Sequence, residues 1–191
     1  MPTDGGGSVG PNAILQTARA LRDIAGSAIE RDVLCCAGLK AYLDHPPRSM
    51  VPQAEVARLF AALRSRLTEA EADVVLAQAG QWTAHYIIAH RIPRAAAGLI
   101  SLMPVPIGAR LLLTAIARHA WTFAGDGRVG ISRGHPMRLD IGANPLATPG
   151  CPWHCATIAE LFRQLVAPHV RVEHPGCCAR GDELCRFEFA F

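Results

Sequence analysis

Cysteine residues gather near the end of this 191-residue chain, where five of its seven cysteines fall between positions 151 and 185. Thiolate and imidazole are the donors that zinc prefers, and a structural zinc ion takes four of them from short loops. The candidate donors are Cys151, His154, Cys155, Glu173, His174, Cys177, Cys178 and Cys185. The pattern predicts a zinc site, and Cys177 and Cys185, on either side of a Gly181-Asp182 turn, support it best. The alternative is that these are free cysteines buried as small apolar side chains.

The cysteine arrangement argues against a disulfide framework. The count is odd, and two pairs are adjacent in sequence, Cys35-Cys36 and Cys177-Cys178. The start of the chain also lacks the charged segment and apolar stretch of a secretory signal, so a cytoplasmic protein is expected. A metal site with four protein donors has no open coordination position, and the predicted site is therefore structural.

Composition excludes two classes of protein. The net charge of +3, without a basic run, argues against nucleic-acid binding. A membrane-spanning helix is not expected either, because Pro104, Pro106 and Arg110 interrupt the most apolar stretch, residues 95–115. The mean hydropathy of +0.19 still allows peripheral contact with a membrane.

Apolar residues at helical spacing dominate the first 120 residues. Asn12 is expected to begin the first helix, and Thr68 and Glu71 have the spacing of a capping box. Helices are expected over residues 12–25, 28–43, 54–67 and 68–90, and in 94–120 as two helices divided at Pro104–Pro106. Residues 1–11 are rich in glycine and are expected to be disordered.

The remaining residues alternate between short apolar segments and turns, a pattern typical of strands. Strands are expected at 121–123, 129–132, 137–141, 169–173 and 186–191, with a helix over 152–166. The fold class is therefore α+β, with a helical N-terminal half and a small antiparallel sheet crossed by one helix. We place the division between a helical region, 12–120, and a zinc-stapled domain, 121–191.

The segment CCARGDELCRFE, which begins at Cys177, resembles the closing motif of the 4-vinyl-reductase domain. The segments GPNAILQ (10–16), YIIAHRIP (86–93), HAWTFAG (119–125) and GCPWHC (150–155) resemble the bacteriochlorophyll 4-vinyl reductase family. The resemblance covers almost the whole chain after residue 10. It implies a fold related to subunits of the TRAPP transport particle, a homodimer, and an apolar cavity between helices and sheet.

The resemblance also implies a zinc ligand set. In the zinc-binding members a Cys, a Glu and two further Cys correspond here to Cys151, His174, Cys177 and Cys185. His174 departs from the family's Glu, but imidazole is an ordinary zinc donor. Cys155 could replace Cys151 if the alignment shifts. An iron–sulfur cluster is the other use of four thiolates, but the chain lacks a C-x2-C-x2-C run.

The implied function is in bacteriochlorophyll biosynthesis, near the photosynthetic membrane. The expected ligand is a tetrapyrrole intermediate, a Mg-porphyrin or protochlorophyllide, held by a carrier or accessory of a pathway enzyme subunit. The family name instead implies reduction of the 8-vinyl group of divinyl protochlorophyllide, which requires a redox cofactor. The only glycine fingerprint, at Gly5, Gly7 and Gly10, lacks the preceding strand, so no catalytic residue is assigned. A structural docking partner without a ligand is the third possibility.

A bound tetrapyrrole needs a magnesium ligand, ring contacts and groups for its carboxylates. The candidates are His85, His90 and His119 for magnesium, Trp82, Tyr86, Trp121 and Phe123 for the ring, and Arg91, Arg94, Arg110 and Arg118 for carboxylates. Trp82 and Tyr86 have the helical spacing of ordinary core residues, and His119 is equally compatible with a buried structural histidine.

Overall fold

A computed structural model of the chain describes residues 6–191. The N-terminal part contains β1 (Ser8–Val9), α1 (Asn12–Ala25), α2 (Ser27–Cys36), η1 (Lys40–Leu43), β2 (Val51–Pro52), α3 (Gln53–Arg66) and α4 (Glu69–His90). The C-terminal part contains α5 (Arg94–Leu102), α6 (Val105–Arg118), α7 (Trp121–Ala124), β3 (Arg128–Ser132), β4 (Met137–Gly142), α8 (Pro152–Leu165), β5 (Arg171–Gly176), η2 (Cys178–Arg180) and β6 (Leu184–Ala190). The predicted α+β class is confirmed.

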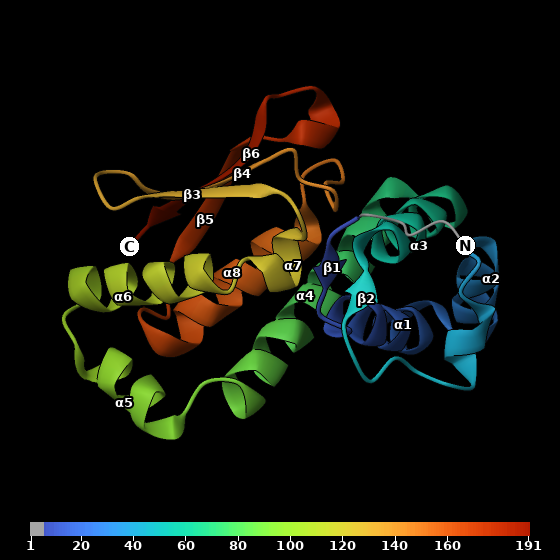
Figure 1. The fold of residues 1–191 in the computed structure, drawn as a ribbon, viewed down its shortest axis with the longest axis horizontal. Helices are drawn as coiled ribbons and strands as arrows, with labels where there is room; N and C mark the ends of the chain where they lie inside the picture. The colour runs from blue at the N-terminus through green and yellow to red at the C-terminus, as the bar shows by residue number, and fades with distance from the viewer. Residues whose placement is uncertain (1–5) are drawn as a thin grey trace.

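The long helix α4 links the two ends of the molecule (Figure 1). It begins at the predicted capping box, in which the Glu71 N–H donates to Thr68 Oγ1 at 3.4 Å and the Thr68 N–H donates to the Glu71 carboxylate at 2.9 Å. These bonds satisfy amide groups that have no partner within the helix. The predicted break between α5 and α6 at Pro104 is also confirmed.

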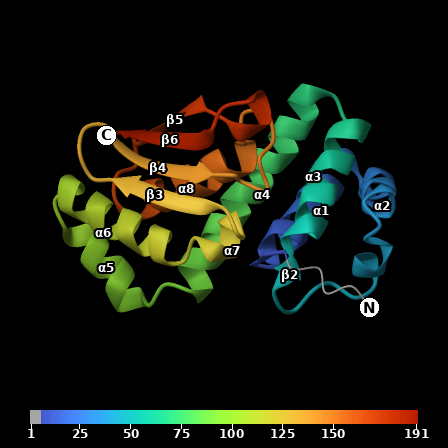
Figure 2. The ribbon, with the colours of Figure 1, turned by 45° about the horizontal axis from the view of Figure 1, so that its top comes forward.

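Four antiparallel strands form the main sheet in the order β3-β4-β6-β5, and α8 lies across one of its faces (Figures 1 and 2). Every second residue of β4 and β6 is buried. The buried residues of the two strands are paired, with Leu139 opposite Phe187 and Ile141 opposite Cys185. One face of the sheet therefore packs on the helices, as the alternation of apolar residues predicted.

Three local predictions were wrong. Residues 121–123 form part of helix α7, not a strand, because three apolar residues do not distinguish the two. The second predicted helix ends at Cys36, since Gly38 adopts a φ of 72°. The predicted disorder of residues 1–11 is wrong at Ser8–Val9, because this strand pairs with Val51–Pro52 and the Val9 side chain is buried. Residues 1–5 lie outside the described range.

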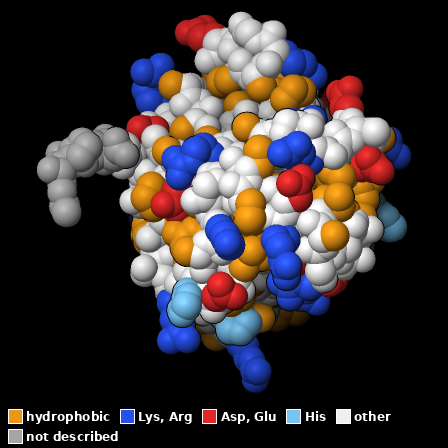
Figure 3. Space-filling model, turned by 90° about the vertical axis from the view of Figure 1, so that its right-hand side faces the viewer, with side chains coloured by type: hydrophobic (Ala, Val, Ile, Leu, Met, Phe, Trp, Pro, Cys, Tyr) orange, Lys and Arg blue, Asp and Glu red, His pale blue; other side chains and the backbone are white. Residues whose placement is uncertain are grey.

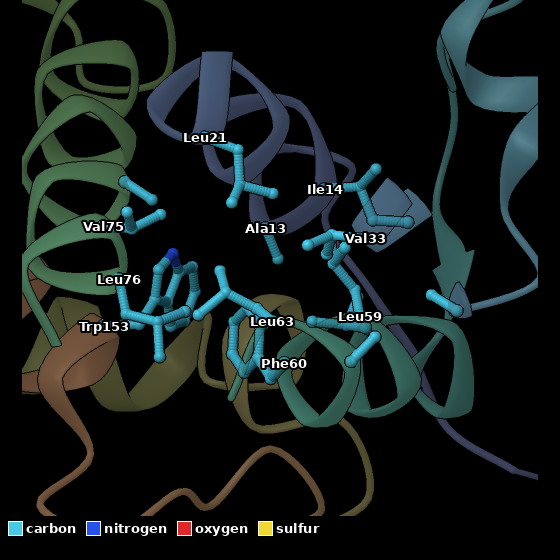
Figure 4. Packing of buried hydrophobic residues seen from close by; sticks show 14 of the residues in the cluster. Ala13, Ile14, Leu21, Val33, Leu59, Phe60, Leu63, Val75, Leu76 and Trp153 are labelled. Atoms are coloured by element: carbon cyan, nitrogen blue, oxygen red, sulfur yellow. The ribbon is translucent and has the colours of Figure 1, made fainter. Parts of the chain in front are cut away.

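Buried apolar side chains form two clusters, and the division between them falls within α4. Ala79 belongs to the N-terminal cluster, whereas Ala84 belongs to the cluster that contains the sheet. Trp153, from α8, reaches into the N-terminal cluster beside Phe60 and Leu76 (Figure 4). The predicted boundary between the two regions was at residues 120/121. The two clusters instead divide within α4, because α5 and α6 pack in the cluster that contains the sheet.

Helices α4 and α8 pack closely against each other at Gly80. A Cβ atom at this position would lie 2.4 Å from the carbonyl oxygen of Trp153. The single hydroxyl hydrogen of Thr157 is shared between the carbonyl oxygens of Trp153, at 2.7 Å, and Gly80, at 3.1 Å. The absence of a side chain at Gly80 thus sets the separation of the two helices that connect the clusters.

Candidate functional site

The structure brings together the four predicted zinc donors. Cys151 immediately precedes α8, His174 belongs to β5, Cys177 follows that strand, and Cys185 belongs to β6. One ligand atom from each lies within 4.8 Å of the other three. The Cys151 sulfur is 3.7 Å from the Cys177 sulfur and 3.6 Å from the Cys185 sulfur. Two thiolates bound tetrahedrally to one zinc ion lie about 3.8 Å apart, and disulfide sulfurs only about 2 Å. The spacing fits a shared metal ion.

Backbone geometry aims these donors at one point. Cys151 has a left-handed φ of 43°, which turns the chain sharply into α8. The Asp182 carboxylate accepts a hydrogen bond from the Cys177 N–H at 2.7 Å and closes the turn before β6. Along β5, residues alternate in direction, so His174 is half-buried while Glu173 is exposed. His174, and not Glu173, is therefore the donor that β5 presents.

The imidazole of His174 has the orientation of a metal ligand. Its Nδ1 lies 2.7 Å from the carbonyl oxygen of Arg186, so Nδ1 carries the proton and donates it. Nε2 then holds a free lone pair, and among the described residues this buried atom has no hydrogen-bond partner. The ring also stacks on Phe187, with centroids 4.6 Å apart. Metal-binding histidines are commonly held by such a backbone carbonyl.

Electrostatics around Cys185 favour a thiolate. A hydrogen bond from the Cys151 thiol lowers the pKa of Cys185 to about 5, with further hydrogen bonds from Asn144 and the backbone of Cys178. The same bond to Cys185, together with burial, raises the pKa of Cys151. Burial lowers the pKa of His174, which keeps its imidazole neutral. An anionic sulfur beside a neutral imidazole is the protonation state that binds a metal ion.

The other candidate donors lie outside this group. The Cys155 thiol faces the carbonyl of Gly150 at 3.5 Å, and the Cys178 thiol faces the carbonyl of Ile141 at 3.7 Å. His154 is hydrogen-bonded through Nε2 to the carbonyl of Phe123 at 3.2 Å. The geometry therefore groups Cys151, rather than Cys155, with the other donors. Zinc as the bound ion stays a prediction.

A cavity of about 420 Å³ lies between α4, α6, α7, α8 and the start of α1, and none of the four metal donors lines it. Its walls are mostly apolar: Ala13, Met50, Ile87, Ile92, Leu112, Ala115, Ile116, Trp153, Ile158 and Leu161. Four of the predicted ligand-binding residues also line it, namely Arg91, His119, Trp121 and Phe123. Such a volume is ordinary for small-molecule sites, which span ~300–1,000 Å³.

The other seven candidates do not line the cavity, and four of them, Trp82, His85, Tyr86 and His90, lie on α4. The cavity face of α4 carries Thr83, Ile87 and Arg91, spaced four residues apart. The predicted residues of α4 make other contacts. The Arg19 guanidinium lies 4.1 Å from the centre of the Trp82 ring, and His85 Nε2 lies 2.9 Å from the Glu160 carboxylate. The rings of Tyr86 and His90 stack on each other, with centroids 4.4 Å apart. A shift of one residue turns a helical side chain by about 100°, so these residues point elsewhere.

Sequence reasoning missed the contribution of α8 to the cavity. Trp153, His154, Thr157, Ile158 and Leu161 all line it. His154 is 1% exposed, and burial lowers its pKa to about 4. The helical spacing of Ile158 and Leu161 indicated a buried face, but periodicity does not tell a packed face from a cavity wall.

No helix in residues 6–191 is both long and apolar enough to cross a membrane. The predicted homodimer and its partner enzyme remain predictions.

No protein-family model matches the chain. Two curated proteins are similar to it over nearly its whole length, and both are called bacteriochlorophyll synthase 23 kDa chain. The protein from Cereibacter sphaeroides is 42% identical over 186 residues, covering 94% of this chain and 89% of its own length. The protein from Rhodobacter capsulatus is 38% identical over 191 residues, covering 97% and 88%.

Proposed function

The chain belongs to the bacteriochlorophyll synthase 23 kDa chain family, and we propose that it is an accessory protein of bacteriochlorophyll biosynthesis that binds a tetrapyrrole intermediate and transfers it to a pathway enzyme. The observation that carries the proposal is the apolar cavity with Arg91 and His119 in its lining. The relatives' name connects them with a bacteriochlorophyll synthase, and the cavity supports the proposal because a pigment precursor could enter it.

The chemistry of the cavity suits a Mg-porphyrin or protochlorophyllide. Such a molecule is a flat apolar ring with a central magnesium ion and acidic side chains. Aliphatic side chains and the rings of Trp121 and Phe123 would contact the macrocycle, and the His119 imidazole is a possible magnesium ligand. Arg91 is exposed and lines the cavity, where its guanidinium would bind a carboxylate.

Binding is tested by titrating the purified full-length chain with Mg-protoporphyrin and following the Soret band. We expect a shifted band and a saturable curve. Arg91→Gln should weaken binding by roughly tenfold, because it removes a charged hydrogen bond. Ala115→Trp, at an exposed wall position, should obstruct the cavity. Arg31→Gln, on α2, is the matched control.

Three outcomes would replace the proposal. Absence of a spectral shift would favour a docking protein without its own ligand. Equal weakening by the Arg91 and Arg31 variants would place the tetrapyrrole outside the cavity. Turnover of divinyl protochlorophyllide with NADPH by the protein alone would make it the 8-vinyl reductase that the resemblance implies.

We also propose that Cys151, His174, Cys177 and Cys185 bind one structural zinc ion. Support comes from the sulfur spacing and from the free Nε2 of His174. Zinc would neutralise the buried thiolates and tie the start of α8 to β5 and β6. Since four protein donors complete a tetrahedron, the ion would stabilise the fold rather than react with substrate.

Metal analysis of the isolated protein should find one zinc per chain. Cys177→Ser should lose the metal and lower the melting temperature, whereas Cys36→Ser, exposed on α2, should keep both. A full zinc content in the Cys177 variant would contradict the assigned ligands. Visible absorption typical of an iron–sulfur cluster would contradict zinc.

A further inference from the structure

Helices α5 and α6 form a hairpin at the end of the molecule opposite α1 to α3 (Figures 1 and 2). None of the residues of α5 is buried, although the helix is mostly apolar. Leu99 is 55% exposed and Leu102 is 86% exposed, while Ile107 and Leu111 on α6 are each 46% exposed. We call these four side chains the hairpin surface. Exposed apolar side chains in such number mark a contact site.

The pairs within the hairpin surface each lie on one face of their helix. Leu99 and Leu102 are three residues apart on α5, and Ile107 and Leu111 are four residues apart on α6. The opposite face of α6 packs inward, since Leu112 and Ile116 are buried and line the cavity. Helix α6 therefore has one face on the cavity and another face with exposed apolar side chains.

The charged side chains on the chain segment that contains the hairpin are of one sign. Residues 74–125 contain no Asp or Glu, but they include Arg91, Arg94, Arg110 and Arg118, all of which are exposed. The face over the other end of the molecule instead carries charged side chains of both signs (Figure 3). The combination of apolar and exclusively basic side chains is typical of segments that bind anionic lipid headgroups.

From these features we infer that the hairpin surface docks onto an anionic membrane. The nine residues of α5 are too few to span a bilayer, so the helix would lie within the headgroup region. A second copy of the chain fits this surface less well, because a symmetric contact would bring arginines from both copies together. Docking would place the cavity wall formed by α6 beside the lipid. Membrane docking does not depend on which ligand the cavity binds.

Vesicle co-sedimentation tests the docking with the full chain and no pigment. We expect binding to phosphatidylcholine vesicles that contain phosphatidylglycerol, weaker binding at high salt, and little binding to phosphatidylcholine alone. Leu99→Gln and Leu102→Gln should each lower the partition coefficient by roughly tenfold, because each removes an apolar side chain from the lipid. Arg94→Gln and Arg110→Gln should each lower it by roughly fivefold.

Matched controls are Ile24→Gln and Val74→Gln, whose side chains are 46% and 57% exposed on α1 and α4. Both should bind vesicles like the unaltered chain. Absence of vesicle binding, or equal effects of the hairpin and control variants, would overturn the inference. Conversion of a dimer to a monomer by Leu102→Gln in sedimentation analysis would show that a second copy covers the hairpin instead.

Because these tests use lipid without pigment, they are independent of the Soret titration. Vesicle binding with no pigment binding would refute the proposed carrier function and leave membrane docking in place. Pigment binding without vesicle binding would do the reverse.

Discussion

His154 should make the protein less stable in acid, by an amount that follows from its burial. Its side chain is 1% exposed, and its Nε2 lies 3.2 Å from the carbonyl oxygen of Phe123. Burial lowers the pKa of His154 to about 4; the hydrogen bond to Phe123 acts in the opposite direction, and nearby His174 adds a smaller decrease. In the unfolded chain the same imidazole takes up a proton near pH 6.5.

The sign follows from proton uptake. Below pH 6.5 the unfolded chain binds a proton that the folded chain does not bind until the pH approaches 4. The contribution of His154 is therefore fully present above its unfolded pKa and is lost as the pH falls through this window. Between about pH 7.5 and about pH 5, the two pKa values give a loss of about 2 kcal/mol in the free energy of unfolding.

Urea unfolding followed by circular dichroism at both pH values measures this loss. His154→Gln is the matched variant, because its amide can still donate to the Phe123 carbonyl but does not titrate. The free energy of unfolding of the variant should fall by about 2 kcal/mol less than that of the unaltered chain. Losses from Cys185 and His174 occur in both proteins and cancel in the difference. Equal losses would refute the reasoning, since His154 would then be protonated in the folded state.

Three further substitutions test the packing. Gly80→Ala should cost about 1–3 kcal/mol in thermal unfolding, because its Cβ would meet the Trp153 carbonyl at 2.4 Å, whereas Gly98→Ala, with no atom within 4 Å, should not destabilise α5. Trp153→Ala should cost about 3–5 kcal/mol in urea unfolding, and Trp121→Ala, 54% exposed, much less; similar costs would contradict the packing in Figure 4. Thr68→Ala should cost about 0.5–2 kcal/mol in the same assay by removing the cap of α4, and no change would show that the cap is dispensable.

Prediction from sequence succeeded where the signal is local. The start of α4 follows from Thr68 and Glu71, three residues apart, which satisfy each other's backbone amides. The break between α5 and α6 follows from Pro104, which disfavours helical backbone at the residue before it. For the metal site, the residues alone left eight candidate donors open, and the resemblance to zinc-binding members of the 4-vinyl-reductase domain implied the four that the fold brings together.

Local patterns did not identify the residues around the cavity. Tyr86 and Ile87 are both apolar neighbours on α4, but only Ile87 faces the cavity. The direction of each side chain depends on the rotation of α4 about its own axis relative to α8. The close contact between the two helices at Gly80 sets that rotation. The strand predicted at residues 121–123 was also wrong. These residues are helical, because the chain turns from α6 into α7 with backbone hydrogen bonds such as the one from the Ala124 N–H to the Ala120 carbonyl at 2.7 Å.

The sequence by itself determined the α+β class and most helix limits, because capping, proline and periodicity act over a few residues. It also offered eight candidate metal donors, of which the family resemblance implied four. Only the tertiary structure decided that a ligand atom of His174 lies within 4.8 Å of three cysteine sulfurs, with no hydrogen-bond partner for Nε2 in residues 6–191, and that α8 walls a cavity with Arg91 and His119. These features arise where segments distant in sequence meet. Their geometry depends on helix rotation and strand register, which are properties of the packed chain as a whole.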